Sequence, residues 1–79
     1  MDFIKKKIRQ FQEKKLDEIL DKIEFHQHMK NKLERKHVGT INPETVKIRE
    51  EISFNEKMIE IWQRNEEKIR KQMSDTDNR

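Results

Sequence analysis

The stretch GTINPETV, residues 39–46, decides the fold because it carries the signals that end one helix and begin another. Gly39, the only glycine in the chain, can take the left-handed conformation that follows a helix C-terminus. Asn42 can cap the next helix through its side-chain oxygen, and Pro43 suits the first helical position, where its missing N–H is no loss. Glu44 favours the positive end of the helix dipole. We therefore predict two helices joined by this stretch.

On both sides of the turn, apolar residues recur at steps of three and four, which is the period of an amphipathic helix. Before the turn they form three stripes whose phase changes near residues 12–15 and 23–25, so we expect a bend or contact with more than one neighbouring helix. The three stripes are Ile4, Ile8 and Phe11; Leu16, Ile19, Leu20 and Ile23; and Phe25, Met29 and Leu33.

After the turn one coiled-coil seam runs through six apolar residues, Ile48, Ile52, Ile59, Trp62, Ile69 and Met73. Polar Asn55 and Glu66 interrupt this seam, and such interruptions commonly fix helix register or oligomeric state. The sequence predicts an all-α fold, an antiparallel two-helix hairpin with helices at about 3–37 and 43–73 and a turn at 38–42. Two such hairpins could dimerise into a four-helix bundle.

The composition is that of exposed helices with a narrow apolar stripe: 44% of the 79 residues are charged, 30% are hydrophobic and none is cysteine. So small a domain builds only a modest core, and we expect self-association or a partner. Without cysteine there is no disulfide or thiolate metal site, and no apolar run reaches the roughly 18 residues of a membrane span. We expect a cytoplasmic protein with one domain at 1–73 and a disordered polar tail at 74–79.

Catalytic and metal-binding spacings are missing from the sequence. His26 and His28 are two residues apart on one helix, so they point to different faces and cannot both bind one ion without an outside ligand. Neighbouring acids such as Glu50 and Glu51 do not face each other across a cleft, as paired acid–base catalysis requires. We predict no enzyme activity, no metal and no cofactor.

A second apolar row, Phe54, Met58 and Ile61, lies beside the main seam of the later helix. It makes the middle of that helix apolar over a wider arc than one hairpin partner covers. Aromatic and methionine side chains on a helix face are common anchors at protein interfaces. We predict that these three residues bind a partner, either a second copy of the chain or another protein.

Basic residues gather at the N-terminus in an amphipathic pattern, at Lys5, Lys6, Lys7 and Arg9. In an antiparallel hairpin this segment lies near the C-terminal basic residues, so the open end is predicted to be a basic patch that also contains Lys68, Arg70 and Lys71. Such a patch can steer the protein toward an acidic surface. It leaves open the binding of nucleic acid or of an anionic membrane surface.

The segments Gly39-Thr40, residues 43–48 (PETVKI) and Glu51-Ile52, all within residues 23–59, carry a likeness to a known family. They resemble the small aspartyl-phosphate phosphatases that act on sporulation response regulators, which are helical hairpins of comparable length. The resemblance implies a helical hairpin that binds a signalling protein.

That family carries a Ser-Gln-x-x-Asp signature early in its second helix, and its Asp is essential for dephosphorylation. In the register that matches residues 43–46, Arg49-Glu50 occupy the Ser-Gln positions and Ser53 occupies the Asp position. The resemblance therefore extends to the hairpin, while the residue needed for the phosphatase reaction is replaced.

Together these patterns predict a small non-enzymatic regulatory protein that binds and modulates a partner protein through an apolar helix face. Nucleic-acid binding through the basic N-terminal end is the alternative from a different class. Response-regulator aspartyl-phosphate phosphatase activity is the third alternative.

Overall fold

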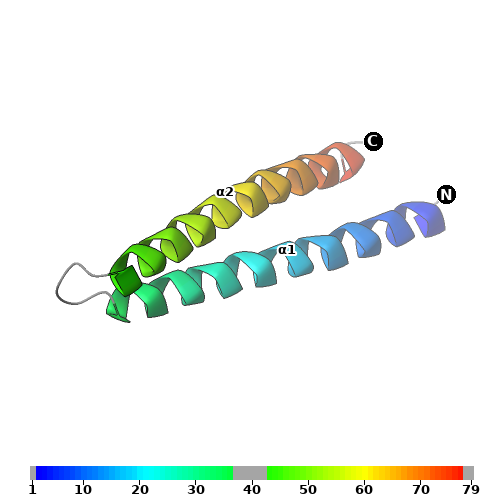
Figure 1. The fold of residues 1–79 in the computed structure, drawn as a ribbon. Helices are drawn as coiled ribbons and strands as arrows, with labels where there is room; N and C mark the ends of the chain where they lie inside the picture. The colour runs from blue at the N-terminus through cyan, green and yellow to red at the C-terminus, as the bar shows by residue number, and fades with distance from the viewer. Residues whose placement is uncertain (1, 37–42, 78–79) are drawn as a thin grey trace.

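The protein is a hairpin of two long α-helices that pack side by side (Figure 1). The computed structural model describes residues 2–36 and 43–77, in which α1 spans Asp2–Lys36 and α2 spans Pro43–Asp77. The start of α1 and the end of α2 lie at the same end of the hairpin, so the helices are antiparallel (Figure 1). The Cα atoms extend over 62 × 14 × 13 Å. The predicted helical hairpin is confirmed, and the predicted turn at 38–42 lies outside the described residues.

The ends of the helices carry the charges and the proline that the sequence predicts for them. Acidic Asp2 and Glu44 lie in the first turns of α1 and α2, and basic Arg35 and Lys36 lie in the last turn of α1. These charges complement the helix dipole at the ends where they occur. Neither helix contains a glycine, and the one proline of the chain is the first residue of α2. Proline is tolerated there because that position donates no hydrogen bond within the helix.

The face of α1 that packs on α2 differs from the predicted pattern. Apart from half-buried Met29, its buried and half-buried residues follow one continuous seam with steps of four and three: Gln12, Leu16, Ile19, Ile23, His26, Lys30 and Leu33. Three of these positions are polar: Gln12, His26 and Lys30. The apolar residues alone therefore form separate stripes in the sequence. The seam keeps one phase over residues 12–33, and the offset apolar residues Ile4, Ile8, Phe11 and Phe25 are exposed. Their contact with a further helix stays a prediction.

The seam of α2 is confirmed. All six of its predicted apolar residues are buried or half-buried, and Thr45, Asn55, Glu66 and Thr76 continue the same steps of three and four. Buried apolar residues come from both helices and are few among the described residues: Ile19, Leu33 and Ile59. The hairpin therefore has the narrow seam of an antiparallel coiled coil, and the flanks of both helices are left uncovered.

A buried hydrogen bond joins the two seams. The Nδ1 atom of His26 lies 2.8 Å from Oδ1 of Asn55, and both residues are buried. Asn55 Nδ2 donates a second hydrogen bond to the carbonyl oxygen of Glu51 at 2.8 Å. Because Oδ1 can only accept, His26 Nδ1 carries the hydrogen and donates it. Sliding α2 by one heptad would separate these partners, so the pair fixes the register of the two helices.

The second helix is longer than predicted. The sequence placed its end at residue 73 and a disordered tail at 74–79, but α2 continues through 74–77, while residues 78–79 lie outside the described part of the chain. Thr76 explains the difference because it extends the seam by one position. Its hydroxyl donates to the carbonyl oxygen of Gln72 at 2.9 Å and accepts from Gln12 Nε2 at 3.3 Å.

Within the described residues, neither helix is long and apolar enough to cross a membrane. The polar side chains on the seam and on the exposed flanks account for this, because they interrupt each apolar row within two or three turns. The architecture is that of two amphipathic helices that bury one edge against each other.

Two neighbouring residues of α1 test the position of the seam. Ile19 is 2% exposed and Leu20 is 37% exposed. Ile19→Ala should lower the free energy of unfolding by about 2–4 kcal/mol, because it removes buried methyl groups and leaves a cavity. Leu20→Ala should cost less than half of that amount. Urea unfolding followed by circular dichroism at one protein concentration checks this, and equal losses would show that the seam is misplaced.

The buried pair gives a second prediction. Asn55→Ala should cost about 1–3 kcal/mol of unfolding free energy, because it leaves the His26 Nδ1–H buried without an acceptor. Replacing both residues, by His26→Leu and Asn55→Leu, should recover most of that loss but allow more than one register, seen as extra amide resonances by NMR. The control is Asn31→Ala, which removes an exposed 3.2 Å bond from Gln27 and should change stability by less than about 0.5 kcal/mol. A double variant with one set of resonances and wild-type register would contradict this role.

Candidate interaction surface

The flanks of the seam give the hairpin two unlike faces. On one side lie Phe25 and Met29 of α1 with Phe54, Met58 and Ile61 of α2, which we call the apolar face. Met58 and Ile61 follow Phe54 by four and seven residues, so the three form one row along α2. Phe25 and Met29 of α1 line the same hollow as Phe54 of α2, so the apolar residues of both helices lie on the same side of the hairpin. This face includes all three residues predicted to bind a partner.

A shallow hollow lies in the apolar face between the helices, bordered by Phe25, Met29 and Leu33 from α1 and by Phe54 from α2. The ring of His26 forms part of its floor. It makes edge-to-face contacts with Phe25, at 5.2 Å between ring centroids, and with Phe54, at 6.3 Å. Such contacts hold aromatic side chains in fixed positions. The residue that sets helix register therefore also supports the two phenylalanines of the apolar face.

The apolar face is open to solvent. Phe25 is 57% exposed, Phe54 is 58% exposed and Ile61 is 46% exposed, while Met58 is half-buried. Charged residues border the hollow toward the turn end of the hairpin: Lys47, Glu50 and Glu51. An apolar centre with a charged border is the usual organisation of a protein interface.

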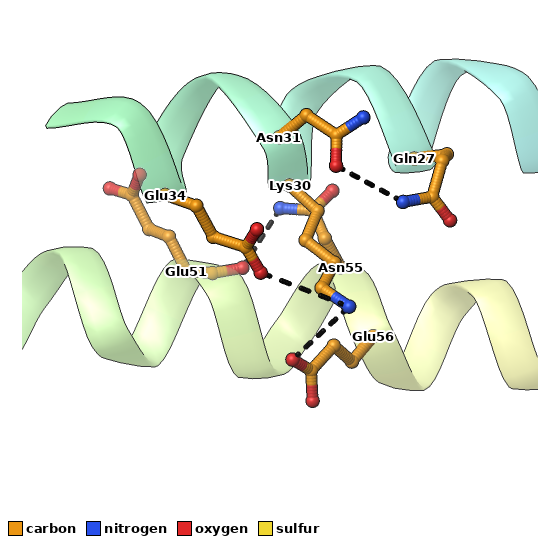
Figure 2. A network of polar contacts seen from close by, with 7 residues as sticks. All are labelled: Gln27, Lys30, Asn31, Glu34, Glu51, Asn55 and Glu56. Atoms are coloured by element: carbon orange, nitrogen blue, oxygen red, sulfur yellow. Dashed lines mark hydrogen bonds and ion pairs between the residues drawn. The ribbon is translucent and has the colours of Figure 1, made fainter. Parts of the chain in front are cut away.

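The opposite flank is polar (Figure 2). Lys30 of α1 reaches across the seam with Nζ 3.5 Å from Oε1 of Glu56 on α2 and 3.9 Å from Oε1 of Glu34. Beside it Gln27 donates to Asn31 at 3.2 Å. These contacts are partly exposed, and such pairs contribute about 0–1 kcal/mol each. This flank is therefore well hydrated and has no need of a covering partner.

The cations of the predicted basic patch are exposed on both α1 and α2. Lys5, Lys6, Lys7 and Arg9 are exposed on α1, and Lys68, Arg70 and Lys71 are exposed on α2. Two carry partners on their own helix: Arg9 Nε lies 3.2 Å from Glu13, and Arg70 Nε lies 2.7 Å from Glu66. Lys68 and Arg70 are two residues apart, so they point about 200° apart around α2. Binding of nucleic acid by these seven cations as one surface stays a prediction.

His26 and His28 lie on different faces of α1, as their spacing of two residues predicts. His26 is buried in the seam, whereas His28 is exposed. Within the described parts of the chain, no group of three or more His, Cys, Asp or Glu side chains is arranged to hold a metal ion. His26 Nδ1 and Asn55 Oδ1 are hydrogen-bonded to each other across the seam, so these two buried residues have a structural explanation.

Sequence reasoning missed two members of the apolar face, Phe25 and Met29. They were grouped with Leu33 as the last of three apolar stripes before the turn, although Leu33 belongs to the seam and Phe25 does not. The signal that separates them is the seven-residue spacing of Gln12, Ile19, His26 and Leu33, all buried, in which two members are polar. Hydrophobicity alone does not mark Gln12 and His26 as seam positions, so this spacing becomes visible only with the packing of the two helices.

Ser53, at the position of the phosphatase Asp, is exposed on α2 and lies one residue before Phe54. Comparison of the whole chain with protein-family models, curated proteins and solved structures finds no match. The functional argument therefore depends on the contrast between the two faces of the hairpin.

Proposed function

We propose that this chain is a small non-enzymatic interaction protein that binds and regulates a partner protein through the apolar face. The observation that supports the proposal is the contrast between the flanks of one seam. Both flanks are exposed to solvent at least in part, yet large apolar side chains gather on one and ion pairs and amides on the other. Contiguous exposed apolar residues with a polar border mark interaction sites in small proteins.

The size of the domain adds a thermodynamic reason for a partner. Three buried apolar residues form a small core for two helices of 35 residues each. Complete burial of a Phe, Ile or Met side chain is worth about 1.5–3 kcal/mol, so covering the apolar face adds substantially to a small total. A partner that presents one or two helices would convert the hairpin into a three- or four-helix bundle.

The hollow between the helices suits a helical partner. Its apolar border of Phe25, Met29 and Phe54 can accept a large apolar side chain from a facing helix, as a knob enters a hole. Lys47, Glu50 and Glu51 at one end supply both signs of charge, which can select the direction of the bound helix. A second copy of the chain offers the same row of residues and would form a symmetric four-helix bundle.

Phe54→Asp should reduce partner binding at least about 100-fold, because a buried carboxylate without a partner costs several kcal/mol at an interface. Its 58% exposure means that the helical content by circular dichroism should stay close to that of the wild type. Binding is measured by recovery of proteins on immobilised wild-type and variant chain, with nuclease treatment to remove contacts through nucleic acid. Met58→Asp should have the same effect on binding, with a larger loss of stability since Met58 is half-buried.

The matched control is Val46→Asp, which introduces the same charge at an apolar residue that is 48% exposed and lies off the apolar face. It should retain both binding and helical content. Equal loss of binding in Val46→Asp and Phe54→Asp would contradict the proposal. Unfolding of Phe54→Asp alone would instead show that this face is part of the core.

Self-association is tested separately by sedimentation equilibrium. If a second copy covers the apolar face, the wild-type chain should be dimeric and Phe54→Asp monomeric at the same concentration, since an isologous interface places the new charge against its own copy. A monomeric wild type would assign the apolar face to a different protein. A dimer that survives Phe54→Asp would place the self-association surface elsewhere on the hairpin.

A further inference from the structure

A second apolar patch lies at the open end of the hairpin, at the beginning of α1. It consists of Phe3, Ile4, Ile8 and Phe11, whose exposed fractions are 68%, 64%, 44% and 68%. Ile4, Ile8 and Phe11 follow the steps of four and three that form one row along a helix. We call these four residues the N-terminal patch. The protein interior does not account for them, because the seam of α1 runs through Gln12 and not through this row.

The N-terminal patch is separate from the apolar face, although the two lie on the same side of α1. Met29 follows Phe11 by 18 residues, which is about five whole turns, so the two side chains project in the same direction. Phe11 and Phe25 are 14 residues apart, or about 21 Å along the axis. The positions between them on this side are charged: Lys15, Glu18 and Lys22. A helix bound at the apolar face can therefore end before it reaches the N-terminal patch.

Cations flank the N-terminal patch, and acids lie behind it. The helical angle places Lys5 on one flank of the row and Lys7 and Lys14 on the other, about 70–90° from its centre. Asp2 and Glu13 fall on the opposite side of the helix, and Glu13 is paired with Arg9. The Nζ atom of Lys7 lies 4.9 Å from the ring centroid of Phe3. The row is thus an apolar stripe bordered by positive charge.

We propose that the N-terminal patch docks on a membrane surface that carries anionic lipid. An interfacial helix lies in the bilayer surface with its apolar row buried to about 5–10 Å at the headgroup–acyl boundary. Lysines on the flanks keep their aliphatic stems near that boundary and direct their ammonium groups to the headgroup phosphates. The arrangement of Lys5, Lys7 and Lys14 around Ile4, Ile8 and Phe11 satisfies both requirements.

Charge complementarity favours this occupant over the alternatives. Residues 2–15 contain six basic and two acidic side chains, so the segment is attracted to an anionic surface. Nucleic acid would satisfy the cations but leave the exposed phenylalanines and isoleucines in water, because its backbone offers phosphates. A bilayer surface accepts the apolar row and the positive flanks together. This inference does not depend on the function of the apolar face.

The experiment is co-sedimentation of the full chain with vesicles of phosphatidylcholine and with vesicles that also contain phosphatidylglycerol. The wild type should bind the anionic vesicles, bind more weakly as salt is raised, and show little binding to phosphatidylcholine alone. Lys5→Gln combined with Lys7→Gln should lower the partition coefficient by about fivefold for each lysine. Ile4→Gln combined with Phe11→Gln should lower it at least about tenfold, since both side chains would enter the boundary.

The matched control is Leu20→Gln combined with Val46→Gln, which removes exposed apolar groups from outside both the apolar face and the N-terminal patch and should leave vesicle binding unchanged. Circular dichroism of each variant without lipid checks that the hairpin is intact, as the exposure of all these sites requires. Absence of vesicle binding, or equal binding to both vesicle types, would overturn the proposal. A titration with an RNA oligonucleotide separates the alternative: RNA binding lost in the lysine variant, without vesicle binding, would assign the cations to nucleic acid. An equal loss of vesicle binding in the Leu20 and Val46 variant would show that the N-terminal patch is not the site of membrane contact.

Discussion

The pairing of His26 with Asn55 is the constraint on which the rest of the structure depends. The seam positions repeat every seven residues. If all of them were apolar, shifting α2 by seven residues relative to α1 would cost little free energy. The buried hydrogen bond removes that freedom because either residue would lose its partner in a shifted register. It also determines which residues of α1 and α2 stand side by side, and hence the composition of both faces.

The narrowness of the seam explains how one small hairpin can carry surfaces of different chemistry. Each helix buries a single row, so the rows on either side remain available for other contacts. On one flank Lys30 and Glu56 pair across the seam. On the other flank Phe25 and Phe54 border a hollow and contact the ring of His26. The proposed interaction function follows from this division of the flanks, and not from any single residue.

Local signals in the sequence were enough to predict two antiparallel helices, and the periodic apolar residues of α2 were enough to predict its seam. The seam of α1 was not predictable from hydrophobicity, because Gln12, His26 and Lys30 occupy positions that apolar residues usually hold. Their burial depends on partners in the other helix, such as Asn55 and Thr76, and a pattern within one helix does not reveal those. The row Phe54, Met58 and Ile61 was identified correctly as lying beside the seam, while Phe25 and Met29 required the three-dimensional pairing of the helices.

Burial is uneven along the hairpin, and this affects how cooperatively the hairpin unfolds. The buried apolar residues Ile19 and Leu33 lie between Leu16 and the turn end of α1, and Ile59 lies at the matching level of α2. The first ten described residues of α1 are exposed. Helix in that opening segment is held mainly by its own backbone hydrogen bonds, and short isolated helices are marginal in water. The hairpin can therefore open from its free end by fraying, one turn at a time, while the His26–Asn55 register is preserved. Ordering of those first turns becomes a local event that a bound surface can favour without any rearrangement of the rest of the molecule.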